Sequence, residues 1–131
     1  MFNKGNIYGS LKRFKDPHYI ICMEDEVEGK EFFNACIITH CSHADNTEHI
    51  MMEPNHFDPN YSIQCSPKGT YLVKVGFEKK KMEISPSIEG KLTPQGIKFV
   101  EDNMSECNYS YFPHPIWEYA KKENKQHKTK Q

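Results

Sequence analysis

The sequence predicts a small mainly-β domain of the kind that closes into a barrel, with the strands first and one or two helices near the C-terminal end. Two observations predict this fold class. Short apolar stretches rich in β-branched and aromatic residues recur between Gly5 and Ile84, and turn residues separate them. A clear helix-start signal then appears at Thr93.

The predicted strands follow in order along the chain. The segment Gly5–Leu11 opens the fold, His18–Met23 follows, and the acidic stretch Glu24–Gly29 forms a hairpin turn in which Gly29 takes a positive φ. So short a connection makes the return strand Lys30–Thr39 antiparallel to His18–Met23. Further strands are expected at His49–Met52, Tyr61–Cys65, Thr70–Gly76 and Lys79–Ile84, with a bulge or bend at Gly76-Phe77.

The strand Lys30–Thr39 is the one around which the domain is organised. Alternation sets its odd-numbered residues Phe33, Ala35, Ile37 and Thr39 on one face and its even-numbered residues, ending with His40, on the other. Both faces are largely apolar, as in a central strand of a small barrel. The strand then ends in hydroxyl, imidazole and thiol groups, which is a common way to build a site.

The helix signal is the segment Leu92–Ile97. Thr93 suits the N-cap, Pro94 suits the first helical position, and Leu92 with Ile97 makes a hydrophobic staple. The helix is expected to run to about Asn103 with Val100 facing inward. A last short helix is expected at Ile116–Ala120.

Length and composition exclude several classes of protein. The 131 residues suit one domain, expected at 1–120, followed by a polar Lys-rich tail at 121–131. A net charge of −1 argues against a nucleic-acid binder that is basic over its whole surface. No apolar run approaches the roughly 20 residues of a membrane span, so no membrane partner is expected.

Cysteine usage bears on the compartment. The five cysteines are odd in number and scattered, and the start MFNKGNIYGS lacks a hydrophobic signal core. We therefore expect free thiols and a cytoplasmic location.

The His/Cys-rich region between Cys36 and Cys65 invites a zinc or thiol interpretation. No C-x-x-C or H-x-x-x-H spacing brings two ligands to one ion, and Cys36 lies about 13 Å along the strand from His40. Nothing marks Cys41 as an activated thiol. We expect neither metal nor cofactor, although a metal or thiol enzyme built on the loop from His40 to His56 stays open as a third hypothesis.

A cation group offers a different chemistry. Lys12, Arg13 and Lys15 precede His18, and the antiparallel pairing places His18 where the strand ending at Thr39 also ends. Cations, an imidazole and a hydroxyl at one end of a sheet could bind a phosphate and stabilise its developing charge. The alternative is a solvated loop beside a strand end. The run Lys79–Lys81 is interpreted as a solvated strand edge.

Four short stretches, in this order, resemble the PemK/MazF-type toxins of bacterial toxin–antitoxin pairs, which are small SH3-like barrels that cut RNA. The stretches are Lys4–Tyr8, Asp16–Ile21, Ala35–Thr39 and Ile88–Thr93. The resemblance implies metal-independent cleavage of single-stranded RNA to a 2′,3′-cyclic phosphate and a 5′-hydroxyl. It also implies a homodimer and an antitoxin protein as partner.

The match to this family's site is incomplete. Thr39 fits the threonine or serine that ends the family's third strand, but Asp16 stands where an arginine is expected. An aspartate repels phosphate instead of neutralising it. Our first hypothesis is a toxin-like endoribonuclease in which Thr39 and Arg13 contact the transition state, His18 transfers protons, and His40, Lys12 and Lys15 bind substrate. The second is a catalytically inactive barrel that binds protein or RNA.

Overall fold

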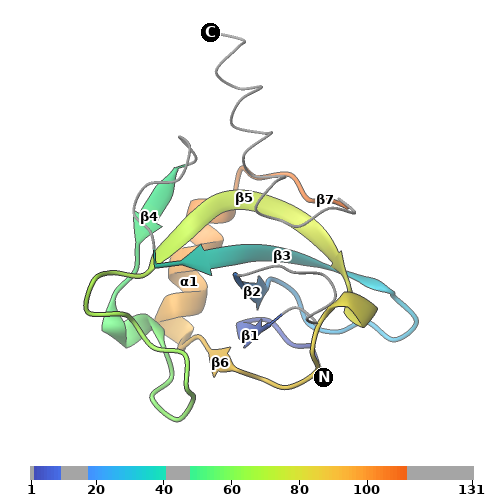
Figure 1. The fold of residues 1–131 in the computed structure, drawn as a ribbon. Coiled ribbons are helices and arrows are strands. Elements are labelled where there is room, and N and C mark those ends of the chain that lie inside the picture. Colours follow the sequence, from blue (N-terminus) through green and yellow to red (C-terminus); the bar gives the residue numbers. More distant parts are fainter. Residues whose placement is uncertain (1, 10–17, 41–47, 112–131) are drawn as a thin grey trace, which may run out of the picture.

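The computed structural model describes residues 2–9, 18–40 and 48–111 of the 131-residue chain. These residues form a mainly-β domain of seven strands and one α-helix, which confirms the predicted mainly-β class (Figure 1). The strands are β1 (Asn6–Tyr8), β2 (Tyr19–Cys22), β3 (Phe32–Thr39), β4 (His49–Met51), β5 (Tyr71–Lys80), β6 (Gly90–Lys91) and β7 (Ser110–Tyr111). The α-helix is α1 (Pro94–Met104), and two 3₁₀ turns are η2 (Pro54–His56) and η3 (Lys81–Glu83).

The strands pair in the order β4-β5-β3-β2-β1-β6, and β7 lies parallel to the far part of β5. Among the described residues this path is open, so the expected closed barrel is not found. One isolated bridge between Phe57 and Leu92 joins the segment after β4 to the segment after β6. The sheet is therefore curled enough to bring its two ends together without a continuous ladder.

The pair β3–β5 is the longest in the sheet and is irregular. Ala35 pairs with Phe77, but Ile37 pairs with Val73, so β5 carries two additional residues between these points. The predicted irregularity near Gly76 is thus a bulge inside a continuous strand. A Cβ atom on Gly76 would lie 2.8 Å from the Tyr109 ring, so glycine lets the chain before β7 pack closely on β5.

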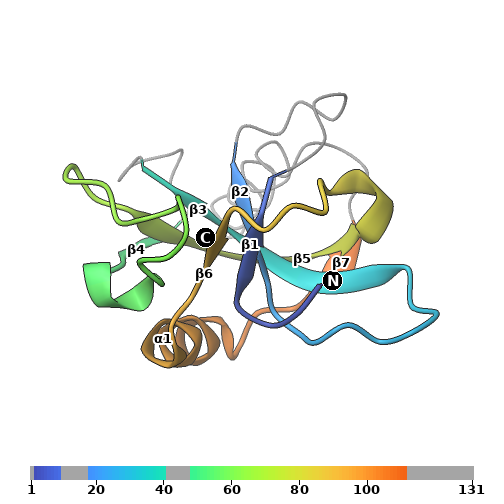
Figure 2. The ribbon, with the colours of Figure 1, turned by 90° about the horizontal axis from the view of Figure 1, so that it is seen from below.

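Strand alternation produces two hydrophobic clusters, one on each face. Ile20, Ile37 and Val73 belong to the cluster that contains Tyr8, Phe33 and Phe77. The other face carries Ile21, Cys36, Ile38 and Leu72, which pack with Val100 and Met104 of α1. We call the face that carries the first cluster the outer face, and the face that carries the second cluster the helix face. Figure 2 shows α1 nearly end-on, on one side of the sheet.

The helix begins as the sequence predicts. The Thr93 hydroxyl accepts the Gly96 N–H at 3.1 Å and donates to the Asn55 carbonyl at 2.7 Å, so the same side chain caps α1 and ties it to η2. Pro94 occupies the first turn, where it gives up no intrahelical bond. Val100 is buried as expected.

Several expected elements differ from the structure. Tyr61–Cys65 is not a strand, because the Ile63 N–H binds the Glu89 carbonyl in a single connection instead of a ladder. The strand expected at Lys79–Ile84 ends at Lys80, and η3 follows. The short strands β6 and β7 were not predicted, because two residues are too few to show the alternation of apolar and polar side chains that marks a strand. The helix expected at Ile116–Ala120 and the tail at 121–131 lie outside the described residues.

Candidate functional site on the outer face

The antiparallel register brings His18 and Thr39 together. Tyr19 pairs with Ile38 and Ile20 with Ile37, so the same register extended by one residue sets His18 across from Thr39. Both residues follow the alternation of the outer face, through Ile20 and Ile37. The predicted proximity of His18 to the end of the third strand is therefore confirmed. The Thr39 residue is only 8% exposed.

His40 contacts the opposite side of the sheet. Its Nδ1 atom lies 3.0 Å from the Thr70 hydroxyl, which also accepts the Ser66 N–H at 2.8 Å. Thr70 is fully buried and precedes Leu72 of the helix face by two residues. Because that hydroxyl accepts from Ser66, its proton is available to a neutral His40 imidazole. The structure thus separates His40 from Thr39, with which the sequence analysis grouped it.

His49 joins the outer face instead. It pairs with Val73 in β5, and Val73 pairs with Ile37 in β3, so all three residues form one cross-strand row. The Nε2 atom of His49 and the Nδ1 atom of His18 are both shielded from solvent. Thr39 itself pairs with Tyr71, and Tyr71 pairs with Met51, so His49 lies in the next cross-strand row and is separated from Thr39 by β5. The sequence analysis named His49 only as part of a strand, although the alternation of His49-Ile50-Met51 could have assigned its face.

The remaining predicted site residues lie outside the described part of the chain. Lys12, Arg13 and Lys15, together with Asp16, fall within residues 10–17, which are outside the described part of the chain. Cys41 falls within residues 41–47, which are also outside it.

The Lys79–Lys81 run is not the solvated edge that its sequence suggests. Lys79 is only 2% exposed. The Lys80 ammonium lies 5.7 Å from the Phe32 ring centroid and 5.1 Å from that of Tyr111. Lys81 pairs with Glu26 at 3.1 Å. These cations hold strands and loops together and do not form an open basic surface.

In the described part of the chain, His56, Cys22 and Cys36 are in structural positions. The His56 Nδ1 atom accepts the Glu53 N–H at 3.0 Å, its ring packs on Phe99, and burial lowers its pKa. Burial raises the pKa of the Cys36 thiol above its ordinary range and that of Cys22 to about 11. Such thiols are poor nucleophiles at neutral pH. Within the described ranges, no three His, Cys, Asp or Glu side chains gather as metal ligands.

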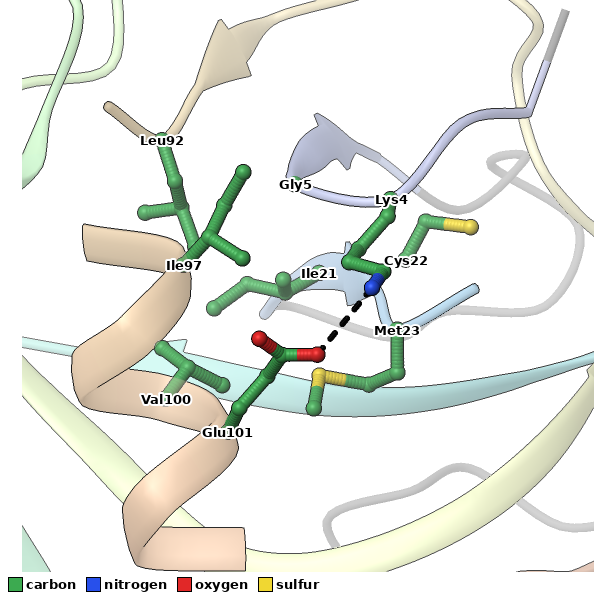
Figure 3. Close-up of a pocket in the computed structure, with 9 residues that line it drawn as sticks. All are labelled: Lys4, Gly5, Ile21, Cys22, Met23, Leu92, Ile97, Val100 and Glu101. Carbon is green, nitrogen blue, oxygen red and sulfur yellow. Dashed lines mark hydrogen bonds and ion pairs between the residues drawn. The ribbon is translucent and has the colours of Figure 1, made fainter. Parts of the chain in front are cut away.

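A small depression lies on the helix face, between α1 and the strands β1 and β2 (Figure 3). Apolar side chains including Ile21 and Val100 line it, and the Lys4–Glu101 ion pair spans its mouth at 3.1 Å. Its lining is mostly apolar packing residues, and it lies across the sheet from Thr39.

Comparison of the chain with protein-family models, with curated proteins and with solved structures found no match. In the described part of the chain, no helix combines the length and the apolar character that crossing a membrane requires.

Proposed function

We propose that this chain is a toxin-like, metal-independent endoribonuclease that cleaves single-stranded RNA. The observation that carries the proposal is the common face of His18, Thr39 and His49, on which His18 lies beside Thr39 and His49 lies one cross-strand row away, beyond β5. Imidazoles change charge near neutral pH and can both accept and donate a proton. A hydroxyl on the same face can bind the phosphate on which charge develops.

In the proposed reaction the RNA 2′-hydroxyl attacks the adjacent phosphorus and gives its proton to one imidazole. The P–O5′ bond breaks, and the other imidazole protonates the departing 5′-oxygen. The products are a 2′,3′-cyclic phosphate and a 5′-hydroxyl, so atoms and protons balance without a metal ion. Arg13, Lys12 and Lys15 are proposed to neutralise the phosphate, a role that rests on the sequence alone.

The resemblance to the PemK/MazF-type toxins supports the same class of reaction. In this proposal the curled sheet, with its ends joined by the Phe57–Leu92 bridge, is an open variant of their SH3-like barrel. An antitoxin protein and a second copy of the chain are the partners that this resemblance implies.

The second candidate is a catalytically inactive module that binds RNA or protein. The low exposure of Thr39 favours it, because a phosphate needs access to the hydroxyl. The aspartate at position 16 favours it as well.

The experiment is incubation of the purified protein with a long single-stranded RNA in EDTA, beside four variants. Thr39→Val removes the hydroxyl but keeps the branched shape, and His18→Ala and His49→Ala each remove one imidazole. Loss of a general acid or base slows such a reaction by about 10² to 10⁴-fold. His40→Ala is the matched control, since its ring contacts Thr70 on the other side of the sheet.

Fragments with 2′,3′-cyclic phosphate ends, made by the parent protein and by His40→Ala but lost in the other three variants, support the nuclease. Intact RNA at high protein concentration overturns it in favour of the binding module. Equal cleavage by Thr39→Val and the parent protein overturns the assignment of this face.

A further inference from the structure

The turn η2 holds the two ends of the sheet together on the helix face. It follows β4, at one end of the strand order, and it packs against α1, which follows β6 at the other end (Figure 2). Phe57, directly after η2, forms the bridge with Leu92, and the Asp58 N–H binds the Lys91 carbonyl at 2.8 Å. We call η2, Phe57 and Asp58, together with their partners from Lys91 to Gly96, the junction.

One histidine is central to the junction. The His56 backbone carbonyl accepts the Thr93 N–H at 3.0 Å, and it lies so close to Gly96 that a Cβ atom there would collide with it. The His56 imidazole packs on the Phe99 ring of α1, with the ring centroids 4.4 Å apart, and the residue is 6% exposed. The backbone and the side chain of this residue therefore both hold η2 on α1.

The imidazole fits this position only in its neutral form. Its Nδ1 atom accepts the Glu53 N–H at 3.0 Å, so Nδ1 carries a lone pair and the one ring hydrogen is on Nε2. A protonated ring would instead direct Nδ1–H at the Glu53 N–H, and turning the ring over would put a carbon-bound hydrogen there. Protonation thus removes the acceptor from a hydrogen bond and leaves a charge in a buried position.

The charged groups around the junction do not make up for this loss. The Glu53 carboxylate, on the same turn, favours the charged imidazole, but burial opposes it more strongly and lowers the pKa of His56. Among the described residues, the other charged groups of α1 and of the adjoining segments are engaged elsewhere or exposed: Lys98 with Asp102, Glu101 with Lys4, the Asp58 carboxylate with the Asn60 N–H, and Lys91 at the surface.

We propose that His56 is a pH-sensitive latch, and that protonation of its imidazole in mild acid releases η2 from α1 and opens the junction. The charged ring reaches water only if η2 moves, and the Thr93 and Gly96 contacts of the same residue are then lost. The bridge between Phe57 and Leu92 opens with them, so the two ends of the sheet separate. Because burial lowers the pKa of His56, the latch is closed at neutral pH and opens as the pH falls through the folded-state value, below about 6.5.

The test is an NMR titration of the full-length protein between pH 7.5 and 5.0. The nitrogen shifts of the imidazole report when His56 becomes charged. Hydrogen exchange of single amides, corrected at each pH for the rate in an unfolded chain, reports whether the junction is closed. The protection of the Glu53, Thr93 and Asp58 amides is expected to fall by about tenfold as His56 is charged, the size of effect that follows when a buried donor loses its acceptor.

One reference amide and two variants separate the latch from other effects of acid. The Lys81 N–H, which binds the Glu31 carbonyl at 2.9 Å outside the junction, is expected to keep its protection. His56→Asn keeps an acceptor without titrating, so its junction amides should stay protected at pH 5.0. His40→Asn is the matched control and should open like the parent protein, because the His40 ring contacts Thr70 instead.

Three results would overturn the latch. The first is a His56 imidazole that stays neutral down to pH 5.0, and the second is junction amides that keep their protection while His56 is charged. The third is an equal loss of protection at Lys81, which would mean that acid unfolds the whole domain. The titration of the parent protein decides the question by itself if His56→Asn does not fold. None of these results depends on RNA cleavage.

Discussion

Gly96 in the first turn of α1 packs directly against the backbone carbonyl of His56 in η2. A Cβ atom on Gly96 would collide with the His56 carbonyl oxygen, and its next neighbours there are also backbone atoms. The helix and the turn after β4 therefore approach more closely than any side chain would allow. This contact, together with the Thr93–Asn55 hydrogen bond, sets α1 against the helix face.

Gly96→Ala is expected to destabilise the protein despite alanine's higher helix propensity. The propensity gain is about 1 kcal/mol, while overpacking against backbone that cannot rotate away costs about 1–3 kcal/mol or more. Urea unfolding followed by circular dichroism measures the net loss. Gly9→Ala is the control, because a Cβ there has nothing within 4 Å, and its midpoint should barely move. A more stable Gly96→Ala protein would mean that η2 and α1 do not pack as described.

Thr93→Ala is expected to lower the free energy of unfolding by about 1–2 kcal/mol. It removes both the cap of α1 and the bond to the Asn55 carbonyl. Thr93→Ser keeps the hydroxyl and should recover most of the loss. Equal destabilisation by serine and alanine would assign the effect to the lost methyl group instead.

The buried His56 predicts a stability that falls in mild acid. Because burial lowers its pKa in the folded state, the unfolded chain binds the proton first as the pH drops below about 6.5. The stabilisation is complete above that pH and declines toward the folded-state pKa. His56→Asn keeps an acceptor for the Glu53 N–H without titrating, so its unfolding midpoint should change less between pH 7.5 and 5.5. The same pH dependence in both proteins would contradict this assignment.

The Glu26 carboxylate predicts a second loss of folding stability, at lower pH. Its pKa is lowered chiefly by the hydrogen bond from Lys81, and next by the Phe2 N–H. The contribution of Glu26 to folding stability is present above its unfolded-state pKa near 4.5, and it disappears as the pH falls through the lower folded-state pKa. Glu26→Gln should flatten the stability profile in that range, and added salt should weaken the effect. Glu28→Gln, in the same exposed loop, serves as the control and should leave the profile unchanged.

The fold class, most of the strands and the start of α1 could be predicted from local patterns. The alternation in β3 assigned Ile37 and Thr39 to one face and Ile38 to the other, because a strand's side-chain period does not depend on its neighbours. The cap at Thr93 is equally local. The short strands β6 and β7 could not be predicted, because two residues form a strand only where a neighbour pairs with them.

The sequence by itself determined that His18 lies beside Thr39, since a short hairpin leaves one antiparallel register for two strands with buried faces. Only the tertiary structure decided that His49 shares their face and that His40 contacts Thr70. Those relationships depend on which strand pairs with β5 and where the bulge near Gly76 lies. Each is a long-range packing outcome, and no local run of residues encodes it.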